Sequence, residues 1–239
     1  MAAMTEAAST GRAAPGPSTG DDPLRDAGLN RVRDRYRRLA LFYPLLEPLL
    51  ALPWGARRAA ADALHLVPGT AVLEVGCGTG RNLPYLLARV GPTGRVYGVD
   101  ATEEMLTVAR RWCAARSASN VTLSLGDALE YRFREPLDAL LFSLSYSVIP
   151  SHRAVLDHVW RGLKPGGRLV VLDANLGTGA RSPLLRPYAE LARRYGVLGD
   201  PDRSPWDDLL RLTPLIETRW LWGGPYFVCA AQKPVPETV

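Results

Sequence analysis

Three glycines alternate with other residues in one short segment of the chain, at positions 76, 78 and 80. Glu74 precedes them at the end of an apolar run, and a helical pattern begins directly after them. Glycines at this spacing allow a tight turn in which the backbone approaches a ligand closely, and the start of a helix presents unpaired N–H groups. The pattern predicts a small-molecule site at a strand-to-helix turn. The alternative is a tight turn that binds nothing.

A nicotinamide dinucleotide is one candidate ligand, since G-x-G-x-x-G/A after a strand is typical of dinucleotide sites. Counted from Gly76 and Gly78, the third small residue of that pattern falls on Arg81. Close packing of helix against strand needs a small residue there, so Arg81 disfavours a nicotinamide-dependent oxidoreductase. The carboxylate of Glu74 would repel a pyrophosphate and would stabilise a cationic ligand, directly or through water.

The elements that must position this loop alternate along the chain from about residue 68. Apolar runs predict strands at 71–77, 95–100, 121–125, 137–144 and 168–173, and helical patterns occupy 81–89, 103–116, 152–162 and 184–195. This alternation predicts a doubly wound α/β fold with helices on both faces of the sheet. Two final runs, 215–221 and 226–231, flank a Gly-Gly-Pro turn and predict a hairpin. We therefore expect a Rossmann-like sheet of seven strands, six parallel and one antiparallel.

The chain divides into three predicted parts. Residues 1–23 are small and polar and predict a disordered tail. Residues 24–67 predict an N-terminal helical lid, because Leu29, Val32 and Tyr36 recur at helical spacing. Residues 68–239 form the predicted core.

Composition excludes several classes of protein. The net charge is +5, yet the 29 basic residues are nearly all Arg and are scattered, which disfavours a nucleic-acid surface. The 3 Cys residues form no C-x-x-C pair, so neither a disulfide framework nor a metal site is expected. No apolar run is long enough to cross a membrane, and the N-terminus lacks a secretory pattern. These features predict a cytoplasmic protein.

Four segments resemble, in order and spacing, the motifs of class I S-adenosylmethionine-dependent methyltransferases. They are E-x-G-x-G-x-G at 74–80, Y-G-V-D at 97–100, G-D-A at 126–128 and L-K-P-G-G at 163–167. The resemblance covers about residues 36 to 232 and implies a methyltransferase with S-adenosyl-L-methionine as its cofactor. By this resemblance Asp100 accepts from the ribose hydroxyls, or otherwise caps a helix. Asp127 accepts from the adenine amino group beside the Ala128 N–H, or otherwise belongs to a turn.

The resemblance also implies a full set of cofactor-binding residues. Met105 is expected to pack on the nucleoside, with a helix-core role as the alternative. The set comprises Tyr43, Glu74, Gly76, Cys77, Gly78, Gly80, Asn82, Asp100, Ala101, Met105, Asp127, Ala128 and Ser143.

The acceptor side is less specified. Tyr146 and His152 follow the fourth strand and are the catalytic candidates, with a packing aromatic and a solvated helix start as alternatives. Y-R-R at 36–38 followed by Phe42 and Tyr43 resembles the start of bacterial betaine-lipid N-methyltransferases, although Pro44 stands where that family has Asp. This resemblance favours N-methylation of a small-molecule or lipid-headgroup acceptor. The alternatives are an O- or C-methyltransferase of a natural-product or quinone pathway, as in ubiquinone/menaquinone-type methyltransferases, and a non-catalytic S-adenosylmethionine-binding protein.

Two segments flank the predicted acceptor pocket. Arginines at 31–38 adjoin an apolar stretch, so the lid could contact an anionic membrane surface peripherally; a solvated arginine face is the alternative. An insert at 175–214 is expected to complete the pocket through Arg181, Arg186, Tyr188 and Trp206. The sequence leaves the oligomeric state open.

Overall fold

The computed structural model describes residues 23–39, 52, 54–175, 200, 203, 205–221 and 225–236, with side chains in the first helix described from 26 to 37. The predicted tail up to residue 22 and the predicted helix at 184–195 lie outside the described residues. So do Tyr43 and, in the insert, Arg181, Arg186 and Tyr188.

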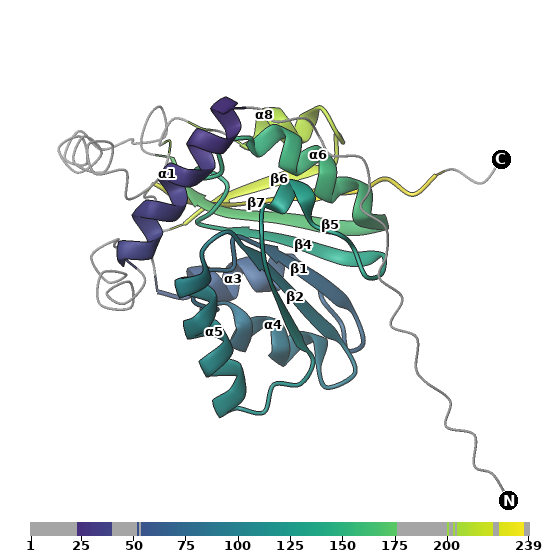
Figure 1. Ribbon diagram of the computed structural model, residues 1–239. Coiled ribbons are helices and arrows are strands. Elements are labelled where there is room, and N and C mark those ends of the chain that lie inside the picture. Colours follow the sequence, from purple (N-terminus) through teal and green to yellow (C-terminus); the bar gives the residue numbers. More distant parts are fainter. Residues whose placement is uncertain are drawn as a thin grey trace, which may run out of the picture.

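A seven-stranded sheet forms the centre of the molecule (Figure 1). Its strands in chain order are β1 (Ala71–Val75), β2 (Arg95–Asp100), β3 (Val121–Leu125), β4 (Leu137–Ser143), β5 (Leu163–Ala174), β6 (Ile216–Trp220) and β7 (Tyr226–Gln232). Their spatial order is β3-β2-β1-β4-β5-β7-β6. β7 runs antiparallel to both β5 and β6, and the other pairs are parallel. The predicted fold class, with one antiparallel strand in the terminal hairpin, is confirmed.

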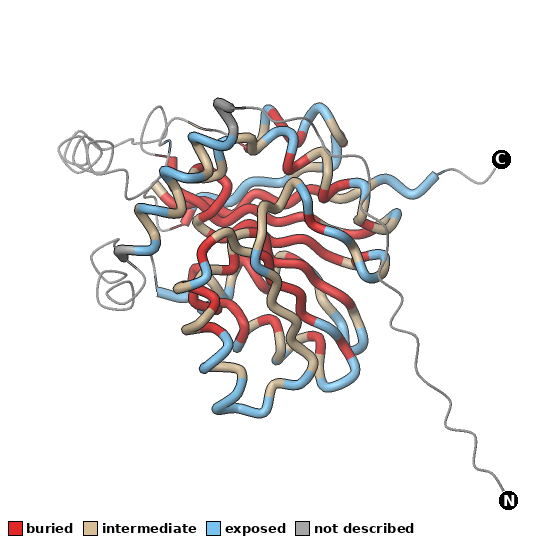
Figure 2. The backbone as a smooth tube through the Cα atoms, viewed as in Figure 1, coloured by how far each residue is buried: buried red, intermediate tan, exposed pale blue. Residues whose placement is uncertain are grey.

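Helices cover both faces of this sheet. In the described part of the chain these are α3 (Ala56–Ala63), α4 (Leu83–Val90), α5 (Glu103–Ala115), α6 (His152–Gly162) and α8 (Pro205–Leu210). The first helix, α1 (Pro23–Leu39), contacts mainly α5, and a 3-10 turn, η2 (Ala128–Glu130), contacts α6. Successive β1 residues point to opposite faces: Val72 packs with α3 and α4, whereas Leu73 packs with α6 and α8. Every β1 residue is therefore buried, and the buried segments in Figure 2 run through the middle of the sheet.

The fifth strand begins five residues earlier than the apolar pattern predicts. β5 starts at Leu163, which pairs with Leu137 before a register shift in the ladder to β4. The sequence pattern does not predict this part of the strand because it contains the run Lys-Pro-Gly-Gly, and proline and glycine are unusual in strand interiors. Gly166 adopts a φ of +79°, and its N–H donates to the carbonyl of Lys233 at 2.8 Å.

The strand order reverses between β1 and β4, which are neighbours although β2 and β3 separate them in the chain. The connections from these two strands leave toward opposite faces, and a crevice opens at their carboxyl ends. The glycine-rich loop follows β1 at this point. No helix in the described part of the chain is both long and apolar enough to cross a membrane.

Candidate functional site

A cavity opens at the carboxyl edge of the sheet, with an empty volume of about 1020 Å³ including its mouth. Segments far apart in the chain meet there: the glycine-rich loop, the ends of β2, β3 and β4, and α1. Most predicted cofactor residues line it, namely Glu74, Gly76, Cys77, Gly78, Asn82, Asp100, Ala101, Met105, Asp127, Ala128 and Ser143. Their common location supports one ligand site.

Glycine occupies each of the three positions in the loop for a different structural reason. A side chain on Gly76 would meet the Cβ of Ser145 at 2.6 Å, so the turn needs glycine to pass the loop after β4. Gly78 has a φ of +52°, and a Cβ built there meets nothing within 4 Å. Gly80 does not line the cavity. Its Cβ would meet Leu83 at 2.7 Å and Ala109 at 3.2 Å, so its lack of a side chain serves helix packing rather than ligand approach.

Asp100 ties the end of β2 to the glycine-rich loop. Its Oδ2 accepts from the Gly78 N–H and its Oδ1 from the Thr102 N–H, both at 2.8 Å. Burial raises the pKa of this carboxyl, and the backbone N–H donors oppose the shift. The N-cap residue of α5 is Thr102, so the bond from its N–H to Asp100 forms a turn just before the helix and is not the helix cap of the alternative interpretation. Each oxygen keeps lone-pair capacity for a hydroxyl donor, so this turn contact and a ribose role are compatible.

Asp127 and Met105 occupy neighbouring walls of the cavity. Asp127 Oδ1 accepts from the Leu129 N–H at 2.9 Å and so starts the η2 turn. Met105 is 3% exposed in the first turn of α5. Asp127 therefore has its alternative role in a turn, and Met105 has its alternative role in the core of a helix. Both residues also line the cavity, where they face the predicted ligand.

Glu74 is a buried carboxyl at the bottom of the cavity. Its Oε1 accepts from Asn82 Nδ2 at 2.5 Å, while its Oε2 has no hydrogen-bond partner among the described residues. Burial raises the pKa of Glu74 to about 7, and the Asn82 bond and the charge of Arg57 act in the opposite direction. An unsatisfied buried carboxylate oxygen fits a cationic group on the ligand.

Arg57 of α3 is a site residue that the sequence did not predict. Its Nη1 donates to Asn82 Oδ1 at 3.2 Å and to Ser143 Oγ at 3.3 Å, and it lines the cavity. From the sequence alone, an arginine in the alanine-rich helix 56–63 is expected to face solvent. In the structure it follows the buried Ala56 directly. Arg57 and Glu74 place opposite charges on either side of Asn82, an arrangement suited to a zwitterionic amino-acid group.

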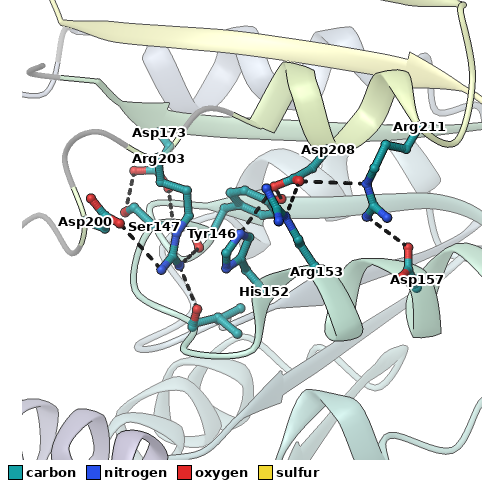
Figure 3. A network of polar contacts seen from close by, with 11 residues as sticks. Tyr146, Ser147, His152, Arg153, Asp157, Asp173, Asp200, Arg203, Asp208 and Arg211 are labelled. Carbon is teal, nitrogen blue, oxygen red and sulfur yellow. Dashed lines mark hydrogen bonds and ion pairs between the residues drawn. The ribbon is translucent and has the colours of Figure 1, made fainter. Parts of the chain in front are cut away.

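Tyr146 and His152, the predicted catalytic residues, do not line the cavity. The Tyr146 hydroxyl donates to Asp208 Oδ2 at 2.7 Å, and His152 Nε2 lies 3.3 Å from the same oxygen (Figure 3). Burial raises the pKa of Tyr146 and lowers that of His152. The Tyr146 ring packs edge-on against Phe142, with ring centroids 5.5 Å apart. For Tyr146 these contacts match the packing alternative. His152 is 18% exposed and packs beside Tyr146, so it does not match the alternative of a solvated helix start, and the contacts of both residues disfavour a direct role in the reaction.

The first helix covers the cavity with one face. Leu29, Val32 and Tyr36 line the cavity, as their helical spacing predicts. On the neighbouring face, Arg33 Nε donates to the Ala101 carbonyl at 3.2 Å, and Arg37 pairs with Glu104 at 3.0 Å. These contacts attach α1 to the segment that follows β2.

Trp206 is not part of the cavity wall. Its ring packs against Trp220 and Phe227, with centroids 6.0 and 5.3 Å away. The predicted acceptor contact from this residue is therefore replaced by a packing role between α8 and the β6–β7 hairpin.

Comparisons with known proteins agree with this geometry. Residues 72–167 match the family model of a methyltransferase domain. A demethylmenaquinone methyltransferase of Symbiobacterium thermophilum is 33% identical over 216 residues, which cover 78% of this chain and 85% of that protein. One of Shouchella clausii is 29% identical over 62% of this chain and 64% of its own length.

Solved structures share the fold. A SAM-dependent methyltransferase from Aquifex aeolicus superposes with a TM-score of 0.53 at 24% identity, over 89% of this chain and 99% of that one. A Haemonchus contortus phosphoethanolamine N-methyltransferase in complex with phosphomonomethylethanolamine and S-adenosylhomocysteine gives 0.61 at 18% identity, over 76% of this chain and 53% of that one.

Proposed function

Because the chain belongs to the class I S-adenosylmethionine-dependent methyltransferases, we propose that it methylates a small, largely apolar acceptor of the quinone type. One observation carries this acceptor class: the cavity wall formed by α1 and the loop after β4 is mostly apolar and uncharged, with Leu29, Val32, Val148, Ile149 and Pro150 beside Tyr36, Ser145 and Ser151. The relative that is 33% identical is named for demethylmenaquinone, which supports the same choice.

The cofactor half of the cavity is proposed to lie along the glycine-rich loop. Asp100 would accept from ribose hydroxyls, and Asp127 would accept from the adenine amino group. Glu74 would stabilise the ammonium of the methionine part, and Arg57 its carboxylate. When bound, S-adenosylmethionine supplies an activated methyl group. The residues of the chain then orient the acceptor toward it and exclude water. The methyl group replaces a proton of the quinol, from the ring carbon or the hydroxyl, and this proton leaves to solvent as S-adenosylhomocysteine forms.

The prediction of an amine acceptor gains no support from this geometry. The acids that line the cavity are Glu74, Asp100 and Asp127, and none of them belongs to α1 or to the loop after β4. The described acceptor wall therefore offers no carboxylate to a cationic amine. Carbon or oxygen of a quinol ring is the better fit to an apolar wall.

Transfer of a radiolabelled methyl group from S-adenosylmethionine tests the acceptor class. We expect chemically reduced 1,4-naphthoquinone to be labelled at least about tenfold faster than phosphoethanolamine, because burying a charged phosphate or amine against apolar walls is unfavourable. Reductant without protein is the control. NMR of the product distinguishes a ring-carbon from an oxygen methyl group. Labelling of phosphoethanolamine alone would contradict the proposal, and binding of S-adenosylmethionine without turnover would favour the non-catalytic alternative.

Of the predicted lid over residues 24–67, we propose that α1 is the part that covers the cavity. Three cavity-lining residues on one helix face support it. The predicted boundary near residue 68 is too late for α3 (Ala56–Ala63), because this helix packs in the core against β4, β5 and β7. Membrane contact by this lid is less well supported. Its exposed side carries Arg31 and Arg37 together with Asp26 and Asp34, so the described face has mixed charge. Mixed charge favours a solvated face over docking on an anionic surface.

Cofactor affinity is expected to rise with pH through the titration of Glu74. Burial holds the pKa of Glu74 at about 7 in the free protein, above its ordinary value, so ionisation of this group costs stability as the pH rises toward 7. A ligand ammonium favours the ionised form, so binding displaces a proton. Between about pH 6 and about pH 7.5, the dissociation constant of S-adenosylhomocysteine should fall by about an order of magnitude.

Calorimetry in buffers of different ionisation enthalpy measures both the affinity and the released proton. Glu74→Gln should bind with a flatter pH dependence and without that proton release. An unchanged pH profile in the Gln variant would assign the titration to another group and remove Glu74 from the cofactor site.

A further inference from the structure

The loop that follows β4 forms one wall of the cavity and is fixed from its other side. Leu144, Ser145 and residues 148–151 line the cavity. Leu144 has a φ of +57°, a left-handed conformation that is unfavourable for a branched side chain. Such a conformation persists only where surrounding contacts hold it. The Leu144 N–H donates to the Leu172 carbonyl at 2.7 Å, and the residues after Leu144 are held by other segments.

The side chain of Arg203 holds the loop by hydrogen bonds to backbone carbonyls of the loop. Its Nη1 donates to the Tyr146 carbonyl at 3.0 Å and to the Ile149 carbonyl at 2.7 Å (Figure 3). The side chain is 16% exposed, so these bonds are largely shielded from water. Just before it in the chain, the Asp200 N–H donates to the Ser147 carbonyl at 3.0 Å. One short segment thus anchors three carbonyls of the loop.

Two aspartates complete the support. Asp173, at the end of β5, accepts from the Ser147 N–H at 2.9 Å and from its hydroxyl at 3.0 Å. Asp208 of α8 accepts from the Tyr146 hydroxyl. The N–H groups of Val148 and Ile149 bond back to the Ser145 carbonyl, both at 3.1 Å, and close the turn. The apolar wall of Val148 and Ile149 therefore depends on polar bonds made behind it.

We propose that Arg203 is a positioning residue for the methyl acceptor, acting by holding the loop 144–151 as a preformed wall. The inference rests on the proposed function, in which this wall contacts the acceptor. A guanidinium suits the task because its rigid fork of donors holds two carbonyls at a fixed separation. Ser145, the loop residue that lies against Gly76, is held separately, because its hydroxyl donates to the Val75 carbonyl at 2.6 Å. In the described part of the chain no hydrogen bond of Arg203 reaches the glycine-rich loop or Asp100, so the cofactor half of the site should not depend on it.

Removing the guanidinium should therefore separate acceptor from cofactor. In Arg203→Met two carbonyls lose their donor, and the loop should sample other conformations. We expect amide hydrogen exchange of residues 145–149 to accelerate at least about tenfold. The affinity for S-adenosylhomocysteine should change by less than about twofold. With reduced 1,4-naphthoquinone, the KM should rise and the kcat should fall, together lowering kcat/KM by about tenfold or more.

Arg211→Met is the matched control. It removes a guanidinium from the same network, where Arg211 pairs with Asp157 at 3.4 Å and lies 3.9 Å from Asp208, but it bonds to no loop carbonyl. Its exchange and kinetics should equal those of the unaltered protein. Arg203→Lys, which keeps a donor and a charge, should recover part of the effect, and it replaces the Met variant if that protein does not fold.

Each outcome decides the inference. Unchanged exchange at 145–149 in the Arg203 variants would overturn it, and so would a loss of S-adenosylhomocysteine affinity equal to the loss of kcat/KM. If the unaltered protein does not methylate reduced 1,4-naphthoquinone, the proposed acceptor class fails, while the exchange and cofactor measurements still decide the role of Arg203.

Discussion

A Gly78→Val protein is expected to lose S-adenosylmethionine binding and to remain folded. Gly78 lines the cavity, and a Cβ built on it points into space with no protein atom within 4 Å. The free protein therefore accommodates the side chain, at a strain of about 1–2 kcal/mol from its φ of +52°. The cofactor must use that same space, so its dissociation constant should rise more than about 100-fold.

Gly69→Val separates ligand exclusion from backbone strain. Gly69 also has a positive φ, of +90°, and a Cβ on it would have Thr93 Oγ1 as its nearest atom, at 3.7 Å. It lies just before β1, at the amino ends of the strands and away from the cavity. Both variants should lower the melting temperature by about 2–8 °C. Calorimetric titration with S-adenosylhomocysteine should show lost binding in the Gly78 variant alone. Equal affinities in the two variants would mean that the glycine at 78 serves the turn and not the ligand.

The parts of the fold that the sequence predicts best are those fixed by local rules. The strand β2 (Arg95–Asp100) and the helix α6 (His152–Gly162) begin and end where the apolar patterns predict. Burial of one face gives α6 its helical period, and burial of both faces makes β2 a short continuous apolar run. The glycine-rich loop is also local, since its turn and its ligand approach both act on consecutive residues. The start of β5 is not, because its pairing with β4 crosses a register shift.

The acceptor side was harder to predict because its contacts join distant segments. Tyr146 finds its partner Asp208 in α8, and Arg203 bonds back to Ile149 across 54 residues. An exposed catalytic tyrosine and a buried one with a carboxylate partner have the same local sequence. Arg57 is the opposite case, a residue at the cavity that the sequence did not predict. Its helix contains no motif, and Arg57 reaches Ser143 because α3 packs beside β4.

Asp100 combines a local and a ligand role, and its replacement by asparagine should show both. The two carboxylate oxygens each accept one backbone N–H, from Thr102 and from Gly78. Asparagine has one acceptor oxygen and one NH₂ donor, so one of these N–H groups loses its partner and the charge is removed. Loss of charge-assisted ribose contacts should weaken S-adenosylhomocysteine binding by about 1.5–3 kcal/mol, or about 10- to 150-fold.

Asp138→Asn provides the control for this change. Asp138 also accepts a hydrogen bond from a backbone N–H, that of Ala71 at 2.8 Å, and pairs with Lys164 at 2.7 Å. These contacts lie at the amino ends of β1 and β4, away from the cavity. Thermal melts should show that both variants are folded. Asp100→Asn leaves one backbone N–H without its acceptor, whereas Asp138→Asn keeps an oxygen for the Ala71 N–H and loses the ion pair with Lys164. The affinity should fall only for Asp100→Asn. If a folded Asp100→Asn protein keeps its affinity, the carboxylate is a structural cap of the glycine-rich loop, and the ribose must be bound by other groups at the ends of β2 and β3.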